Sequence, residues 1–307
     1  MIDNKRTSII ILLHNQLPYT KRCLNLLVHT QGLDEVILVD NGSSDCTSEF
    51  LHTFQRNYCG HLDFKIVCNS TNIGGSQGRN QGVEVCTGQL LIFLDNDTYT
   101  LNSDWLSFLI DVLVEKPDLG VVGPMLVFPP NGTVIQSAGG GMTFGGHFGL
   151  LGRGQSVAES RFNYKKMVAW VPTACMACHR ETFEKVGGFD ESLDPFSIGE
   201  DIDFCMRVQS QGLQICYEPK VKIYHYEGTT FNNSFLSKHK KQVFIKHMRL
   251  IRERWREEIK AGILSSEEDI RYLDVRKDYR NINFPRIMVV SGSLGSFANH
   301  QDGEWLL

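Results

Sequence analysis

Short apolar runs alternate with helix-like segments through the first half of the chain. Four runs are short and continuous, as expected of strands buried on both faces, and lie at 8–13, 35–39, 64–67 and 90–94. Apolar residues at helical spacing predict helices around Leu24, around Leu51, over 75–86 and after Ser103, a plausible N-cap. This alternation predicts an α/β fold with a mostly parallel central sheet flanked by helices.

The pattern is less regular after Gly120. Asn131-Gly132 between apolar segments predicts a hairpin, and the glycine-rich stretch 139–154 predicts a mobile loop. Three further strands and three further helices are expected, the strands at 168–171, 213–217 and 221–226 and the helices near 180–188, 200–212 and 237–260. Beyond Phe284 the pattern predicts no element. We therefore expect a C-terminal helical extension and tail over 233–307.

Composition places the chain among ordinary globular proteins. It has 307 residues, 42% of them hydrophobic, and a net charge of −4, which gives no reason to expect a nucleic-acid partner. No apolar run approaches the roughly 18 residues that span a bilayer. The run ending at Leu13 is too short for a signal peptide, so we expect a cytoplasmic protein. Segment 237–260 holds nine Lys or Arg and three Glu. That pattern fits a solvated helix face or peripheral contact with the inner face of a membrane.

The nine cysteines are scattered along the chain. Cys175 and Cys178 form one C-x-x-C pair, but no second pair stands at zinc spacing. We expect buried, reduced thiols.

Candidate chemistry begins where the apolar run at 90–94 stops in Asp95-Asn96-Asp97. An open α/β sheet binds its ligands just beyond the carboxyl ends of its strands. Two carboxylates there suit Mg²⁺ or Mn²⁺, which commonly accompany phosphates. Polar clusters also follow other predicted strands, at His14-Asn15, at 40–43 and at His225. One such cluster is often only a turn, but several in succession predict a metal–diphosphate site along one edge of the sheet.

The ordered set of motifs resembles the inverting family 2 glycosyltransferases. The resemblance covers about 7–230 and rests on Val39-Asp40-Asn41-Gly42-Ser43-Ser44-Asp45, Asn72-Ile73-Gly74-Gly75, Gly78-Arg79-Asn80-Gln81-Gly82, Leu94-Asp95-Asn96-Asp97, Gly187-Gly188-Phe189-Asp190, Gly199-Glu200-Asp201-Ile202-Asp203 and Tyr224-His225. It implies a GT-A fold, with a nucleotide-sugar half (1–127) and an acceptor half (128–232).

The resemblance also implies roles for matching positions. Asp40 would contact the base or ribose of a nucleotide-sugar, Asp95 the ribose, and Asp97 a Mn²⁺ or Mg²⁺ ion on the diphosphate. His225 would be a second metal ligand, although a structural histidine is the alternative. The remaining donor-binding candidates are His14, Asn15, Asn72, Gly75, Arg79 and Asn96. Arg79 would support the phosphates or the acidic cluster, with a structural ion pair as its alternative.

Asp201 is the predicted general base, in the first turn of a helix. Acidic residues there are often only partners of the helix dipole, and the family's Glu-Asp pair is what favours catalysis. A helix N-terminus and a nearby metal would keep Asp201 ionised, and hence a weak base. Glu200 and Trp170 are candidates for acceptor binding, Trp170 with core packing as its alternative.

Two positions depart from the family pattern. His14 stands where tyrosine is frequent, and Thr173-Ala174 replaces a common Gly-Ala. The expected activity is metal-dependent, inverting transfer of a hexosyl or deoxyhexosyl unit from a nucleotide-diphosphate sugar to a glycan or lipid-linked hydroxyl. Two alternatives stay open, a sugar-nucleotide nucleotidyltransferase and a non-catalytic sugar-binding subunit. The segment 12–18 lacks the glycine-rich, basic phosphate loop that the nucleotidyltransferase would need.

Overall fold

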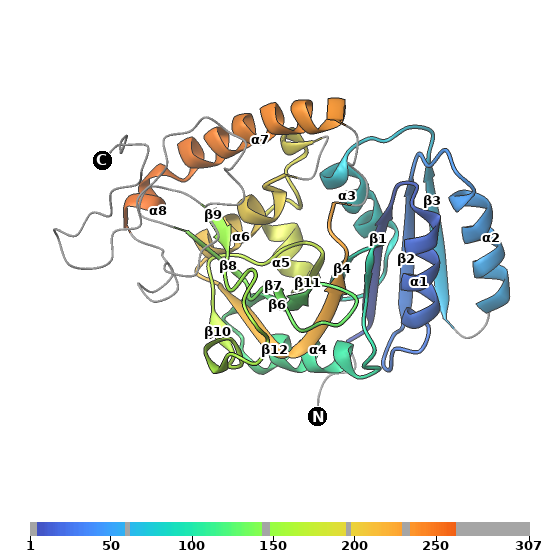
Figure 1. The fold of residues 1–307 in the computed structure, drawn as a ribbon, viewed down its shortest axis with the longest axis horizontal. Coiled ribbons are helices and arrows are strands. Elements are labelled where there is room, and N and C mark those ends of the chain that lie inside the picture. Colours follow the sequence, from blue (N-terminus) through green and yellow to red (C-terminus); the bar gives the residue numbers. More distant parts are fainter. Residues whose placement is uncertain (1–4, 59–61, 143–147, 195–197, 229–233, 262–307) are drawn as a thin grey trace.

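The computed structural model describes residues 5–58, 62–142, 148–194, 198–228 and 234–261 (Figure 1). Its strands are β1 (Thr7–Leu13), β2 (Glu35–Asn41), β3 (Asp63–Asn69), β4 (Leu90–Asp95), β5 (Thr98–Tyr99), β6 (Leu119–Val127), β7 (Ile135–Ser137), β8 (Gly140–Met142), β9 (Phe148–Leu150), β10 (Lys166–Met167), β11 (Cys175–His179) and β12 (Gln214–His225). Its α-helices are α1 (Leu17–Leu27), α2 (Thr47–Tyr58), α3 (Gly75–Val85), α4 (Trp105–Glu115), α5 (Arg180–Lys185), α6 (Glu200–Ser210), α7 (Ser234–Arg254) and α8 (Arg256–Ala261). Two short 3₁₀ turns lie at Ser160–Phe162 and Glu191–Leu193.

A single sheet runs through the molecule in the order β10-β12-β6-β11-β4-β1-β2-β3. The pairs among β1, β2, β3 and β4 are parallel, as is the pair of β6 and β12, whereas β11 runs antiparallel to both of its neighbours. The prediction of a mostly parallel sheet flanked by helices is confirmed. Because both predicted halves share this sheet, the division at residue 127 stays a prediction.

Alternate residues of the central strands face opposite cores. Ile9 and Ile11 of β1 belong to a core that includes residues of α1, α2 and α4, whereas Ile10 belongs to one that includes residues of α3, α5, α6 and α7. The register pairs Leu12 with Asp95 and Leu13 with Asp40. Asp40, the next-to-last residue of β2, and Asp95, the last of β4, therefore lie on strands two positions apart, about 10 Å across the same edge.

Two elements of the sheet differ from the sequence expectation. Residues 168–171 form no strand beyond an isolated bridge from Trp170 to Gly140, and the strand lies instead at β11. β6 is a nine-residue buried strand that the pattern did not predict. Its glycines interrupt the apolar pattern, and they are needed because side chains from elsewhere pack directly on the strand. A Cβ at Gly120 would lie 2.4 Å from Val208, and one at Gly123 would lie 2.7 Å from Val171.

Three smaller expectations also need correction. The described parts of the glycine-rich stretch form a buried antiparallel pair, β8 and β9, and 143–147 lie outside the described residues. The two strands expected at 213–226 are one strand, β12, with a register shift between Glu218 and Lys222. Helix α4 has Asp104 at its N-cap position, and no side chain caps it there, so Ser103 is not the cap.

The single basic helix expected at 237–260 is two helices, because α7 ends at Arg254 and α8 begins at Arg256; α7 is docked on the domain across α6 (Figure 1). Met248 and Ile251 of α7, and Trp255 between the two helices, have buried side chains, and the first two lie within 3 Å of where a Cβ on Gly199 would stand. Fully buried Asp203 of α6 accepts hydrogen bonds from Arg254 (2.7 Å) and Trp255 (3.1 Å). The apolar face of α7 is thus used inside the protein. The predicted tail at 262–307 lies outside the described residues.

The eight described cysteines are free thiols, and six of them are buried as expected, including Cys175 and Cys178 of β11, where burial raises the pKa of both. The expectation is wrong for Cys46 and Cys68, which are exposed. Among the described residues, no helix combines the length and apolarity needed to cross a bilayer.

Candidate active site

Three potential metal ligands meet at the edge of the sheet. Asp95 ends β4, Asp97 follows two residues later, and His225 ends β12. One oxygen of each carboxylate and one imidazole nitrogen all lie within 4.8 Å of one another. The short strand β5 pairs with the end of β12, Thr98 opposite His225, and this pairing brings together residues about 130 apart in sequence.

This donor set fits a divalent cation. Ligands of an octahedral Mg²⁺-sized ion are about 3.0 Å apart when adjacent and about 4.2 Å apart when opposite. The Nε2 of His225 lies 3.2 Å from Oδ1 of Asp97, already near the adjacent spacing. Two carboxylates with one imidazole suit Mn²⁺ and Mg²⁺. Burial lowers the pKa of His225, but the Asp97 carboxylate outweighs this and leaves the pKa raised.

A buried arginine joins this cluster to helix α6. Arg79 of α3 is 3% exposed and donates to Asp95 (2.7 Å) and to Glu200 (3.3 Å). Thr173 also donates to Glu200, at 3.3 Å. The structural ion pair, the alternative considered from sequence, is therefore present. Arg79 connects the strand that carries the first aspartate with the helix that carries Asp201.

The acidic pair at the start of α6 has raised pKa values. Burial and the charge of Asp201 raise the pKa of Glu200, and Arg79 offsets this only in part. Burial also raises the pKa of Asp201, although the hydrogen bond that it accepts from the N–H of Ile202 at 2.8 Å lowers it in part. Burial therefore acts against the helix N-terminus and the metal ion that were expected to keep Asp201 a weak base. Its raised pKa suits a general base better, since proton affinity is closer to working pH.

The donor-binding candidates lie along the ends of β1, β2 and β4. His14 Nδ1 is 2.9 Å from the carbonyl of Asn41, and Asn15 accepts from the backbone of Ser44 at 2.7 Å. Asp40 accepts from the N–H of Ser43 at 2.9 Å, which is the turn-capping contact. Asn72 accepts from Asn41 at 3.0 Å, and Asn96 donates to Thr20 at 2.9 Å. The structure thus gathers these residues at one edge.

The start of α3 is filled by a carboxylate from the protein itself. Asp194 accepts from the N–H groups of Ser76 (2.9 Å) and Gln77 (3.0 Å). Gly74, with φ +107°, leaves the room for it, because a Cβ there would lie 2.2 Å from Cγ of Asp194. The helix N-terminus is an anion site, as the sequence suggested, but its anion is Asp194. Gly75 consequently does not present this terminus to donor phosphates.

Both acceptor-binding candidates are buried. Glu200 is 2% exposed and is held by Arg79 and Thr173, so it does not face an incoming acceptor. The indole of Trp170 packs over Gly140 and donates to the carbonyl of Gly141 at 3.3 Å. Core packing, the alternative considered for Trp170, is what the structure contains.

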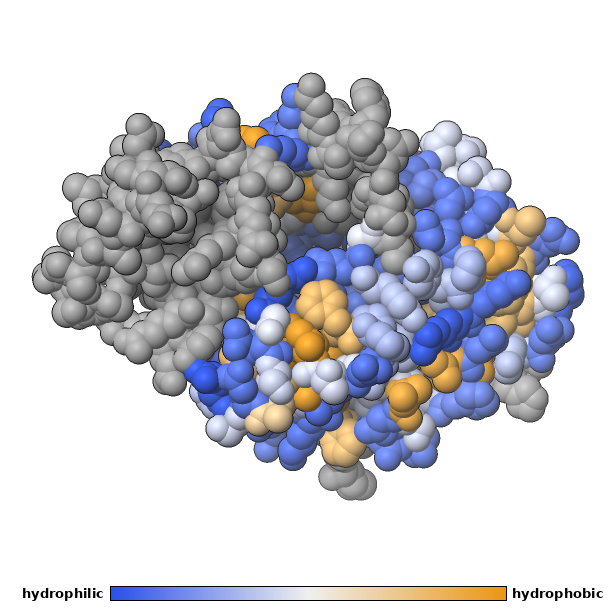
Figure 2. Space-filling model, viewed as in Figure 1, coloured by the Kyte–Doolittle hydropathy of each residue, from blue (hydrophilic) through white to orange (hydrophobic). Residues whose placement is uncertain are grey.

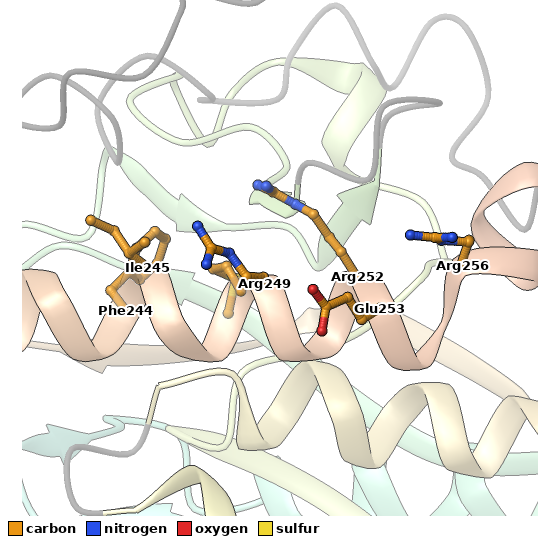
Figure 3. A pocket seen from close by; sticks show the side chains of 7 residues that line it. Phe244, Ile245, Arg249, Arg252, Glu253 and Arg256 are labelled. Atoms are coloured by element: carbon orange, nitrogen blue, oxygen red, sulfur yellow. The ribbon is translucent and has the colours of Figure 1, made fainter.

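A separate cavity of about 320 Å³ lies on the exposed side of α7 (Figure 3). The described residues lining it are Phe244, Ile245, Met248, Arg249, Arg252, Glu253 and Arg256. None of them belongs to the acidic cluster. The cavity holds three arginines, whose side chains point to one side of the helix.

Two residues at the site gave no signal in the sequence. Asp194 follows a 3₁₀ turn and caps a helix more than 100 residues earlier in the chain. Oε1 of Gln136 in β7 lies 2.7 Å from Nδ1 of His225, across 89 residues. Neither stands in a motif, and only the fold brings them to the site.

Comparison with known families decides the classification. The model of glycosyl transferase family 2 matches residues 8–183, more than half of the chain. The chain belongs to glycosyl transferase family 2. A second model, described as the N-terminal domain of galactosyltransferase, matches residues 153–229 of this family 2 chain. Together the two matches include the acidic cluster, Arg79 and Asp201, but not helices α7 and α8.

Curated relatives of this family 2 chain differ in length and name. It is 35% identical over 156 residues to the O-antigen biosynthesis protein RfbC of Myxococcus xanthus, covering 49% of this chain and 12% of that protein. It is 25% identical to the N-acetylglucosaminyl-diphospho-decaprenol L-rhamnosyltransferase of Mycobacterium tuberculosis, covering 90% of this chain and 94% of that one. The match spans only 12% to 40% of the length of RfbC and of three other curated relatives.

A solved structure supports the GT-A fold of the family 2 chain. GalNAc-T7, crystallised with UDP, GalNAc and Mn²⁺, matches with a TM-score of 0.62 at 17% identity, covering 90% of this chain and 55% of that one. At this identity the likeness shows the fold alone. The prediction of a GT-A fold is confirmed.

Proposed function

We propose that the chain is a metal-dependent, inverting glycosyltransferase that moves a sugar from a nucleotide-diphosphate sugar to a hydroxyl group. The observation that carries the proposal is the meeting of Asp95, Asp97 and His225, joined through Arg79 to the helix that begins with Glu200 and Asp201. Asp97 and His225 hold Mn²⁺ or Mg²⁺, which supplies Lewis-acid stabilisation of the departing diphosphate. Asp95 and Asp40 bind the nucleoside.

Asp201 acts as the general base in this proposal. Its carboxylate accepts the proton of the acceptor hydroxyl while that oxygen attacks the anomeric carbon from the face opposite the diphosphate. The bond to the diphosphate breaks in the same displacement, so the anomeric configuration inverts. The raised pKa of Asp201 supports the assignment, because a base with greater proton affinity takes the proton more readily.

The acceptor we propose is a glycan or a lipid-linked sugar, in polysaccharide biosynthesis. The mycobacterial relative matched along nearly its whole length is named for transfer of L-rhamnose to a diphosphate-linked polyprenol sugar. Other relatives are named for O-antigen biosynthesis and for synthesis of poly-β-1,6-N-acetyl-D-glucosamine. These names support a cell-surface glycan as the product.

Contact with an anionic membrane surface through α7 is part of the proposal. Met248 and Ile251 of this helix are buried in the protein, so the contact is electrostatic and uses exposed Arg249 of α7 and Arg256 of α8 beside half-buried Arg252. The described residues on the face in Figure 2 show small separate apolar groups rather than one broad apolar patch. Each arginine near such a surface is worth about 1 kcal/mol.

Vesicle binding tests the membrane contact. The Arg249→Glu/Arg256→Glu variant should bind vesicles containing phosphatidylglycerol much more weakly than wild type, and neutral vesicles should bind neither. Lys185→Glu, which reverses an exposed charge at the end of α5, is the control. Equal binding by all three proteins to the anionic vesicles would remove the membrane contact from the proposal.

The activity is tested with a panel of nucleotide-sugars and Mn²⁺, by release of nucleoside diphosphate. Asp201→Asn should lower transfer by about 10²- to 10⁴-fold. Glu181→Gln, which neutralises an exposed acid in the first turn of α5, should leave the rate unchanged. Transfer at the wild-type rate by Asp201→Asn would refute the base assignment. Formation of nucleoside triphosphate and sugar 1-phosphate when pyrophosphate is added, in place of nucleoside diphosphate release, would indicate a nucleotidyltransferase.

A further inference from the structure

Gln136 stands at an irregularity in the sheet, next to the metal cluster. In the antiparallel pair of β6 and β7, Leu126 is opposite Ser137 and the next residue, Val127, is opposite Ile135. Gln136 is therefore the extra residue of a β-bulge. Bulges redirect a side chain and are common beside active sites. Here Ile135, Gln136 and Ser137 are all buried, so the usual alternation between core and solvent is lost.

The bulge aims the Gln136 amide at the end of β12. Its Nε2 donates to the backbone carbonyl of His225 (3.2 Å) and to the carboxylate of Glu227 (3.3 Å). Its Oε1 lies 2.7 Å from Nδ1 of His225. Glu227 is also paired with Arg153 at 2.6 Å, which fixes that carboxylate. Every contact of this amide is thus made to the segment that carries the histidine.

These contacts determine the orientation of the Gln136 side-chain amide. A carbonyl oxygen and a carboxylate only accept hydrogen bonds, so the atom facing them must be the amide nitrogen. The amide oxygen then faces His225, and an oxygen there can only accept. Nδ1 of His225 must therefore carry a hydrogen. Nε2, on the other side of the ring, is the nitrogen that faces Asp97.

We propose that Gln136 is a positioning residue that fixes the tautomer and ring orientation of His225, so that Nε2 is the metal ligand. This inference rests on the proposed metal site of the glycosyltransferase. Metal-binding histidines generally donate their other N–H to a fixed oxygen, and loss of that oxygen weakens metal affinity by about 10- to 100-fold. Strand β7 thereby controls a ligand of the proposed metal site.

Mn²⁺ binding to the purified full chain, without any sugar nucleotide, tests the inference. Gln136→Met keeps the volume of the side chain and removes the amide, and it should weaken Mn²⁺ binding by about 10- to 100-fold in calorimetry. Gln136→Glu keeps an oxygen that accepts from Nδ1 but loses the N–H groups donated to His225 and Glu227, so its affinity should lie between those of Gln136→Met and wild type. Ser137→Ala, at the next position of β7, removes a hydrogen bond to Gly139 and should leave affinity unchanged.

Electron spin echo spectroscopy of the bound Mn²⁺ adds a signature that a general loss of stability would not produce. Wild type should show ¹⁴N modulation from a coordinated imidazole, His225→Asn should lose it, and Gln136→Met should show it weakened or absent. Unchanged affinity and unchanged modulation in Gln136→Met would overturn the positioning role while the metal site stands. Wild type that binds no Mn²⁺, or Asp97→Ala that binds it equally well, would overturn the metal site and this inference with it.

Discussion

Arg79 is a buried cation between two carboxylates, and its replacement by methionine can be followed quantitatively. The side chain is 3% exposed, and Glu200, one of its partners, is 2% exposed. Methionine fills most of the same space but leaves Glu200 without this ion pair. Breaking a buried pair by removing one partner costs about 3–5 kcal/mol. For a domain of this size, that cost lowers the melting temperature by about 6–20 °C.

The stability that Arg79→Met loses should be partly recovered by a second substitution at Glu200. Most of it comes from the Glu200 charge, so Arg79→Met/Glu200→Gln should recover at least about 1 kcal/mol relative to Arg79→Met. Loss of Arg79 removes an influence that lowers the pKa of Glu200, and that pKa should rise further. A carboxyl whose folded pKa is raised destabilises the fold increasingly as pH rises. The deficit of Arg79→Met should therefore grow as pH rises through about 8, the raised pKa of Glu200 in the wild type.

Urea unfolding at several pH values measures all three effects. Glu200→Gln alone is the matched control, because it leaves Arg79 paired with Asp95. The reasoning is refuted if Arg79→Met costs less than about 1 kcal/mol, or if the double variant is no more stable than the single one.

Three further predictions concern other charged groups. Asp201 must be ionised to act as a base, so the rate of transfer should fall as pH falls through a pKa above the ordinary aspartate value of about 3.9, seen in the pH profile of kcat. Burial alone would raise the pKa of Glu35, but hydrogen bonds led by that of Lys65 lower it to about 2. Glu35 thus contributes about 3 kcal/mol of stability above pH 4.5, and this contribution is lost as pH falls towards 2. In acid unfolding, the difference in stability between wild type and Glu35→Gln should shrink over that range. Asp203→Asn removes the charge that Arg254 and Trp255 contact, so it should cost about 3 kcal/mol of stability and shift the fluorescence of Trp255 to the red. Glu253→Gln, at an exposed position of α7, should change neither quantity.

The sequence predicted those strands whose apolar runs are uninterrupted. β1, β2 and β4 read clearly because their residues are buried alternately in the two cores on opposite faces of the sheet. β3, at the edge of the sheet, was expected to be buried on both faces but is only partly buried. β6 is equally buried, but Gly120, Gly123 and Pro124 interrupt its pattern. Val208 and Val171 pack directly on Gly120 and Gly123 and leave no room for a larger side chain there. A pattern read along one segment carries no information about such partners.

The same limit applies to the site. Asp95 and Asp97 were visible because a strand ends at them, and Asp201 and His225 because an ordered set of motifs carries them. Gln136 and Asp194 act on residues 89 and 118 positions away. Their residue types are ordinary at a bulge and after a turn. Only the packing of the chain against itself distinguishes them from other polar residues.

Contacts between distant segments also determine how the site is held. Arg79 joins the end of β4 to the start of α6, and Asp194, six residues before Glu200, is fixed at the start of α3. Asp203 then anchors α6 to α7 on its other side. Helix α6 is therefore held through buried charged groups on both sides, and the position of Asp201 relative to Asp97 depends on them. Replacement of Arg79 should consequently reduce kcat even under conditions where the variant is fully folded, and a kcat equal to that of wild type would show that the base is positioned without it.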